Sequence, residues 1–177
     1  MKVLVAYASK AGSTKEIAEF IGEELRACGI DADVQGVETA TNLAGYDAFV
    51  VGSALYTFHW LKEARKFVSK NHAALASRPV WIFSSGPTGR KTTDSKGRDL
   101  REVSGPKEVE ELKGLFHPLD HRVFFGAFFP DRLKGTAGLF ARWIPKDETG
   151  DFRDWKEIEG WTRSIAQALQ TGAHAGS

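Results

Sequence analysis

The chain has 177 residues, of which 42% are hydrophobic and 27% are charged, which suits one domain with a single buried core. Its 24 lysines and arginines nearly balance its 23 aspartates and glutamates, so the overall charge argues against nucleic-acid binding. The single cysteine, Cys28, excludes an internal disulfide and a cysteine-rich metal site, and no stretch approaches the ~20 apolar residues of a membrane span, so we expect a cytoplasmic protein.

Apolar runs alternate with helical patterns along the chain. Residues 3–8 are almost continuously apolar, as in a strand buried on both faces, and the apolar residues between 17 and 28 recur at helical spacing. Residues 30–35 alternate between apolar and polar, which predicts a strand at a sheet edge. Three further buried strands are expected at 47–52, 79–83 and 123–129.

Helices are expected between these strands. The apolar stripe from Leu61 to Val68 predicts one helix, and Pro106 is placed to open a short helix that ends near Leu115. The last helix is expected to begin after Asp154 as its N-cap.

This alternation predicts the α/β class. Parallel strands need a crossover, usually a helix, so five strands separated by helices predict a parallel sheet covered on both faces. We expect one domain over residues 1–170 and a flexible tail over 171–177.

A turn rich in hydroxyl groups, from Ser9 to Thr14, follows the first strand. Its last residues begin the sequence Ser-Thr-Lys-Glu (13–16), which has the pattern of a capping box that opens a helix. The free N–H groups and the dipole of that helix, with the nearby hydroxyls, predict a phosphate-sized anion site that Gly12 lets a ligand approach closely. A plain helix start, whose hydroxyls only cap, is the alternative.

Two further loops should reach the same edge of the sheet. GSALYTFHW follows the third strand and SSGPTGRK follows the fourth, and ligands of parallel sheets bind where the strands end. The first loop offers ring faces at Tyr56, Phe58, His59 and Trp60, and the second offers backbone amides for the polar edge of a flavin ring. The alternatives are that the aromatic residues plug the core and that His59, a candidate proton donor, is a plain loop residue.

At these residues the chain resembles the flavodoxin-like superfamily. The phosphate loop of that superfamily, T/S-x-T-G-x-T, stands here as Ser9-Lys10-Ala11-Gly12-Ser13-Thr14, with Ala11 replacing one hydroxyl. The segments AGSTKEIA, GSALYTFHWLKEARKFV and DFRDWKEIEGW resemble flavodoxin-domain proteins of the menaquinone-dependent protoporphyrinogen oxidase type. The resemblance implies a three-layer sandwich with a five-stranded parallel sheet in the order 2-1-3-4-5 and non-covalently bound FMN.

The resemblance also implies which residues bind FMN. The sequence itself has no Ser-His-Asp order, no HExxH motif and no Cys/His metal spacing, so we assign no nucleophile and no metal ligand. The resemblance places the phosphate on Ser9, Lys10, Gly12, Ser13 and Thr14, with Ala11 contributing its backbone alone. One side of the ring would be lined by Ser53, Ala54, Leu55 and Tyr56, and the other by Ser84, Ser85, Gly86, Pro87, Thr88 and Gly89. Lys10 has a solvated surface lysine as its alternative reading.

The segment 130–147 helps to distinguish an enzyme from a simple electron carrier, because in simple carriers the chain runs almost directly from the fifth strand to the last helix. Its pattern predicts a basic amphipathic helix, which either contacts an anionic membrane surface or packs on the domain. Phe128 and Phe129 before it mark an interface or lie under the next helix, so the oligomeric state stays open.

We therefore expect an FMN-dependent oxidoreductase that passes electrons from a reduced small molecule to a quinone-type acceptor, in the manner of protoporphyrinogen oxidation. The alternative is an FMN electron-transfer module that serves a protein partner, although such carriers tend to be strongly acidic and this chain has a net charge of +1. A third possibility, suggested by Ala11, is a domain that has lost the cofactor.

Overall fold

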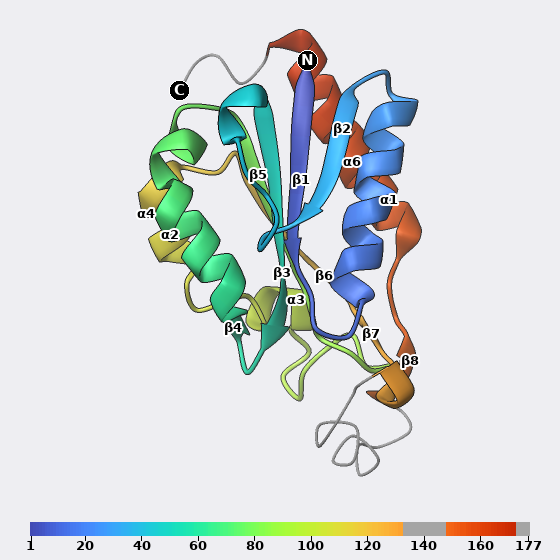
Figure 1. Cartoon of the computed structure of the whole chain (residues 1–177). Helices are drawn as coiled ribbons and strands as arrows, with labels where there is room; N and C mark the ends of the chain where they lie inside the picture. Colours follow the sequence, from blue (N-terminus) through green and yellow to red (C-terminus); the bar gives the residue numbers. More distant parts are fainter. Residues whose placement is uncertain (133–147, 173–177) are drawn as a thin grey trace.

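The computed structural model describes residues 1–132 and 148–172, and a parallel sheet forms the middle of its three layers (Figure 1). The strands are β1 (Lys2–Ala8), β2 (Asp31–Gly36), β3 (Ala48–Tyr56), β5 (Val80–Ser85) and β6 (Asp120–Phe124). They pair in the order β2-β1-β3-β5-β6, and the short β4 (His59–Trp60) folds back antiparallel on β3. This confirms the predicted order, in which β5 and β6 are the fourth and fifth strands.

Helices cover both faces of the sheet. α1 (Ser13–Ala27) and α6 (Trp155–Thr171) lie on one face, and α2 (Lys62–Ala76) and α4 (Val109–Phe116) lie on the other (Figure 1). Successive side chains of a strand point to opposite faces, so β1 supplies Val3 and Val5 to the core under α1 and α6, and Leu4 and Ala6 to the core under α2. The buried run that predicted β1 therefore serves two cores.

The fifth strand differs from its prediction of 123–129. β6 begins at Asp120 and ends at Phe124, and Ala127–Phe128 form a separate strand, β7, which pairs antiparallel with β8 (Gly150–Asp151). At the break, the Phe124 carbonyl accepts from the Gly86 N–H, and the Gly126 N–H donates to the Pro87 carbonyl. The residues after β6 are thus bonded to the loop after β5.

The helix boundaries were predicted unevenly. The Asp154 side chain accepts hydrogen bonds from the N–H groups of Lys156 and Glu157, which confirms the N-cap of α6. The helix expected from Pro106 begins later, as α4, and the short α3 (Leu100–Val103) lies in a polar stretch for which no helix was predicted. The described residues also include the 3-10 turns η1 (Leu43–Gly45) and η2 (Pro130–Arg132).

Two predictions fall partly outside the described residues. The amphipathic helix expected over 130–147 is described only in η2, and the tail expected over 171–177 is described only in the last residue of α6 and its cap, Gly172. Among the helices that are described, none is both long and apolar enough to cross a membrane.

Candidate functional site

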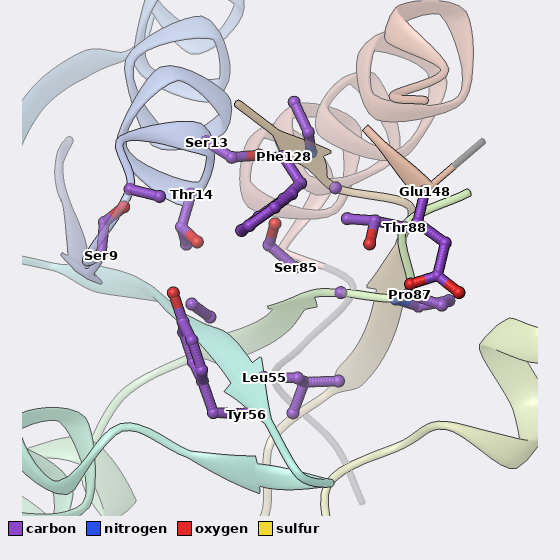
Figure 2. A pocket seen from close by; sticks show the side chains of 15 residues that line it. Ser9, Ser13, Thr14, Leu55, Tyr56, Ser85, Pro87, Thr88, Phe128 and Glu148 are labelled. Carbon is purple, nitrogen blue, oxygen red and sulfur yellow. Dashed lines mark hydrogen bonds between the residues drawn. The ribbon is translucent and has the colours of Figure 1, made fainter. Parts of the chain in front are cut away.

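A cleft of about 260 Å³ lies where β1, β3 and β5 end, beside β7 (Figure 2). We call the part formed by the β1–α1 loop the helix end, and the part formed by the end of β3 and the loop after β5 the aromatic end. The helix end is lined by Ser9, Ala11, Ser13 and Thr14; the aromatic end by Ala54, Leu55, Tyr56, Ser85, Gly86, Pro87 and Thr88; and the rest by Gly126, Ala127, Phe128 and Glu148.

At the helix end, the structure contradicts the predicted capping box. The N-cap of α1 is Gly12, in a left-handed conformation with φ 90°, and its N–H donates to Ser9 Oγ at 3.1 Å. Ser13 is instead the first helical residue, and its Oγ accepts a hydrogen bond from the Ala127 N–H at 2.8 Å. Glu16, the expected partner in the box, pairs with arginines 132 and 153. The two side chains thus bind β7 and these arginines rather than the start of α1.

The helix end presents donors that no described residue uses. Ser13, Thr14 and Lys15 lie in the first turn of α1, and within the described part of the chain their N–H groups have no acceptor. Thr14 is 1% exposed and lines the cleft, and its hydroxyl makes no hydrogen bond with any described residue. Free N–H groups, the hydroxyl of a buried threonine that lines the cleft, and a helix dipole together suit a bound anion.

The aromatic end has one exposed ring and closely packed backbone. Tyr56 is 40% exposed, and the Lys10 ammonium lies 5.0 Å from its ring centroid. Partial burial raises the pKa of the Tyr56 hydroxyl above 10, so the ring is uncharged at neutral pH. A Cβ atom on Gly86 would lie 2.8 Å from Leu55 Cβ, so the loop after β5 approaches β3 as closely as glycine permits. A planar ligand would meet fixed walls here.

Five of the sixteen predicted residues do not line the cleft: Lys10, Gly12, Ser53, Ser84 and Gly89. Ser53 and Ser84 are fully buried, and their hydroxyls hold β4 and the residue after it in place through hydrogen bonds. Ser53 Oγ accepts from the Leu61 N–H at 3.0 Å, and Ser84 Oγ accepts from Trp60 Nε1 at 2.8 Å. These two serines, predicted to line the ring, instead bond to Trp60 and Leu61 within the protein.

Of the four candidate aromatic-loop side chains, Tyr56 alone lines the cleft. Trp60 is 1% exposed, so its alternative reading as a core plug is correct. His59 Nδ1 lies 2.7 Å from Glu108 Oε1, away from the lining residues, and Phe58 is half exposed at the tip of the hairpin.

Sequence reasoning missed the residues that β7 and β8 bring to the cleft. Gly126, Ala127 and Phe128 precede η2 and Glu148 precedes β8, and all four line the cleft. Phe128 therefore forms part of the cleft wall, whereas Phe129 lies against the Arg132 guanidinium, 4.3 Å from its ring centroid. The glycine inside the run 123–129 was the available signal, because glycine inside a strand pattern often marks a break.

Comparisons with known proteins agree with this geometry. The model of the flavodoxin domain family matches residues 4–152. The protoporphyrinogen IX dehydrogenase (quinone) of Escherichia coli is 32% identical over 176 residues, which cover 94% of this chain and 95% of that protein.

Solved structures show the same fold. A flavodoxin from the domain Archaea aligns with a TM-score of 0.61 at 20% identity, and covers 96% of this chain and 99% of its own. A mutant flavodoxin from Pseudomonas aeruginosa aligns with a TM-score of 0.61 at 18% identity, with the same coverage.

Proposed function

The chain belongs to the flavodoxin domain family, and from this premise we propose that it is an FMN-dependent oxidoreductase that passes electrons from a reduced small molecule to a quinone-type acceptor. The observation that carries the proposal is the cleft, which joins a helix start with free N–H groups to an aromatic wall. Protoporphyrinogen-type oxidation is the specific form that the Escherichia coli relative supports, because that protein is named as such a dehydrogenase.

The residues of the cleft suit both ends of FMN. At the helix end, the N–H groups of Ser13 and Thr14 and the Thr14 hydroxyl would hold the phosphate, because none of them has an acceptor among the described residues. At the aromatic end, Tyr56 would cover one face of the ring, and the hydroxyls of Ser85 and Thr88 would meet its polar edge. FMN, when bound, accepts two electrons from a substrate and passes them on one or two at a time.

The size of the cleft supports a reaction at an exposed edge of the ring. Its volume of about 260 Å³ lies below the roughly 300–1,000 Å³ of sites that enclose a ligand. A bound cofactor would thus keep part of its ring at the surface, where a substrate and then an acceptor could each reach it. The protein would contribute orientation and fixed walls, and no described side chain needs to form a covalent bond.

The geometry of the cleft gives less support than the sequence to the third possibility, that the domain has lost its cofactor. Ala11 lines the helix end without a hydroxyl, but the first-turn N–H groups do not depend on the side chain at this position. The hydroxyls of Ser9, Ser13 and Thr14 also line the same end.

The proposed function is tested with the purified protein and three additions. FMN is titrated against the apoprotein while its fluorescence and visible spectrum are recorded; the complex is then reduced with dithionite and mixed anaerobically with menadione. We expect FMN to bind, to bleach on reduction and to recover with menadione, and we expect protoporphyrinogen to replace dithionite as the reductant.

Two results would contradict the proposal. If the bound flavin is reduced by a flavoprotein reductase but turns over with neither menadione nor protoporphyrinogen, the chain is an electron-transfer module. If neither the flavin spectrum nor the melting temperature responds to added FMN, the protein is not a flavoprotein at all.

A further inference from the structure

A carboxylate lies beside the helix end of the cleft. Glu16 belongs to the first turn of α1, and its Oε1 lies 4.0 Å from the position that a Cβ atom on Gly12 would occupy. The dipole at a helix N-terminus stabilises a negative side chain such as Glu16. The same side chain repels a phosphate that binds at that N-terminus, because both are negatively charged. On its own, Glu16 would weaken the anion site suggested by the free N–H groups.

Two arginines pair with this carboxylate, one that precedes β8 in the sequence and one that follows it. Arg132 Nη1, in η2, lies 2.6 Å from Glu16 Oε1, and Arg153 Nη1, between β8 and α6, lies 2.6 Å from Glu16 Oε2. Burial opposes ionisation of Glu16, but the hydrogen bonds and charges of both arginines outweigh it and lower the pKa of the carboxyl group. Glu16 is therefore charged at neutral pH, and each of its oxygens has a cationic partner.

Arg153 is held in place independently of Glu16. Its side chain is 4% exposed, its Nη2 lies 2.6 Å from Asp151 Oδ2, and its guanidinium lies over the Trp155 ring at 4.5 Å from the centroid. Its Nη1 also approaches the Ser13 carbonyl at 3.4 Å. The guanidinium is thus a fixed positive group behind the first turn of α1.

Arg132 is more exposed and lies closer to the loop. Its side chain is 42% exposed, and its Nη1 lies 4.0 Å from the same hypothetical Cβ position on Gly12. The Phe129 ring supports it from the other side. A bidentate or stacked arginine of this kind is not replaced by lysine without loss.

We propose that Arg132 and Arg153 are positioning residues for a phosphate monoester at the helix end: they hold the Glu16 carboxylate and cancel its charge, so that the first turn of α1 can accept a second anion. The inference rests on the proposed function in taking FMN as that monoester. Independently of the arginines, Thr14 is a residue only 1% exposed that lines the cleft, and its hydroxyl has no partner among the described residues, which also indicates a ligand at this end.

The test compares FMN with riboflavin, which has the same ring and no phosphate. We expect Arg132→Gln to weaken FMN about tenfold and to leave riboflavin within about twofold, because a Glu16 carboxylate that keeps Arg153 as its one cationic partner repels the phosphate of FMN and has no phosphate to repel in riboflavin. Combining it with Glu16→Gln should restore FMN affinity to within about twofold of the wild type. Dissociation constants come from quenching of flavin fluorescence at low salt.

Two further variants complete the design. Arg163→Gln is the matched control, because Arg163 pairs with glutamates of α1 and α6 and does not line the cleft, so it should change neither affinity. Arg153→Gln should act in the same direction as Arg132→Gln, and melting of the apoproteins shows which variants are folded. Arg132 is exposed, so the conclusion does not depend on the buried Arg153.

The outcomes separate the alternatives. Equal losses of FMN and riboflavin affinity would make the arginines merely structural. A loss of FMN affinity that Glu16→Gln does not restore would mean that Arg132 contacts the phosphate itself. Either result overturns the proposal.

If the wild type binds neither flavin, the proposed function fails, and the same variants are compared by their thermal shift with inorganic phosphate. A phosphate shift that disappears in Arg132→Gln and returns in the double variant would then support the inference alone, and any other pattern would refute it.

Discussion

Mild acid should destabilise this protein through one partly buried histidine on β6. His121 Nε2 lies 3.0 Å from Ser84 Oγ, and burial lowers the pKa of the imidazole from 6.5 to about 4; Asp120 opposes this shift and Lys113 adds to it. The unfolded chain therefore takes up a proton near pH 6.5, whereas the folded protein does not until about pH 4. Stability is present above pH 6.5 and is lost as the pH falls between these values.

The size of the effect follows from the two pKa values. Between pH 7 and pH 5, the difference in proton uptake amounts to about 2 kcal/mol of unfolding free energy, which for a chain of this size lowers the melting temperature by about 4–8 °C. The carboxyl groups with lowered pKa, such as Asp99 and Asp151, lose their contribution only below about pH 4, so they lie outside this window.

Urea titrations followed by circular dichroism at pH 7 and pH 5 measure this loss. His121→Gln keeps a side-chain amide beside Ser84 and has no titrating group, so we expect most of the pH dependence to disappear in it. His72→Gln, at an exposed position on α2, is the control and should keep the wild-type dependence. If wild type and His121→Gln lose equal stability between pH 7 and pH 5, the assignment to His121 is wrong.

Three substitutions test the walls of the cleft. Ser13→Ala leaves the first N–H of β7 buried without its acceptor, and should cost about 1–3 kcal/mol in urea unfolding of the apoprotein. Thr14→Val should leave the melting temperature unchanged but weaken FMN, and not riboflavin, about fivefold, since it removes a ligand donor that no described residue uses. Gly86→Ala should destabilise the apoprotein by about 1–3 kcal/mol because its Cβ meets Leu55, whereas Gly105→Ala, with open space around it, should not. Unchanged values for the first and third variants, or a riboflavin loss for the second, would contradict these contacts.

The sheet and the last helix could be predicted because their signals are local. A strand buried on both faces needs a continuous apolar run, and an N-cap needs an acceptor such as Asp154 just before the helix, so β1 and the start of α6 follow from a few adjacent residues. β6 is different, since it begins with the charged residues of Asp120–Phe124 at a sheet edge, where the partly exposed strand carries no continuous apolar pattern.

Adjacent serines show how far the site could be predicted. Ser84 and Ser85 looked equivalent in the loop after the fourth apolar run, but β5 alternates its side chains between the two cores. Ile82 and Phe83 lie in different cores, so the next two residues must also face opposite ways. Ser84 turns toward Trp60, and Ser85 lines the cleft. The two-residue period could therefore have separated them, whereas the bond from Ser13 to Ala127 spans 114 positions and has no local signal.

The charge at the helix end also depends on residues far apart in the sequence, and it bears on how much the missing hydroxyl at Ala11 should weaken phosphate binding. The phosphate-loop motif describes six consecutive residues, and these supply N–H groups and hydroxyls whatever lies elsewhere in the chain. Whether an anion is stabilised there also depends on Glu16, and Glu16 is compensated by arginines that are 116 and 137 positions away. One missing hydroxyl removes at most one of several donors, whereas an uncompensated carboxylate would act on the whole phosphate. Under our proposal, the ion pairs of Glu16 therefore matter more than Ala11 for phosphate binding at the helix end of this chain.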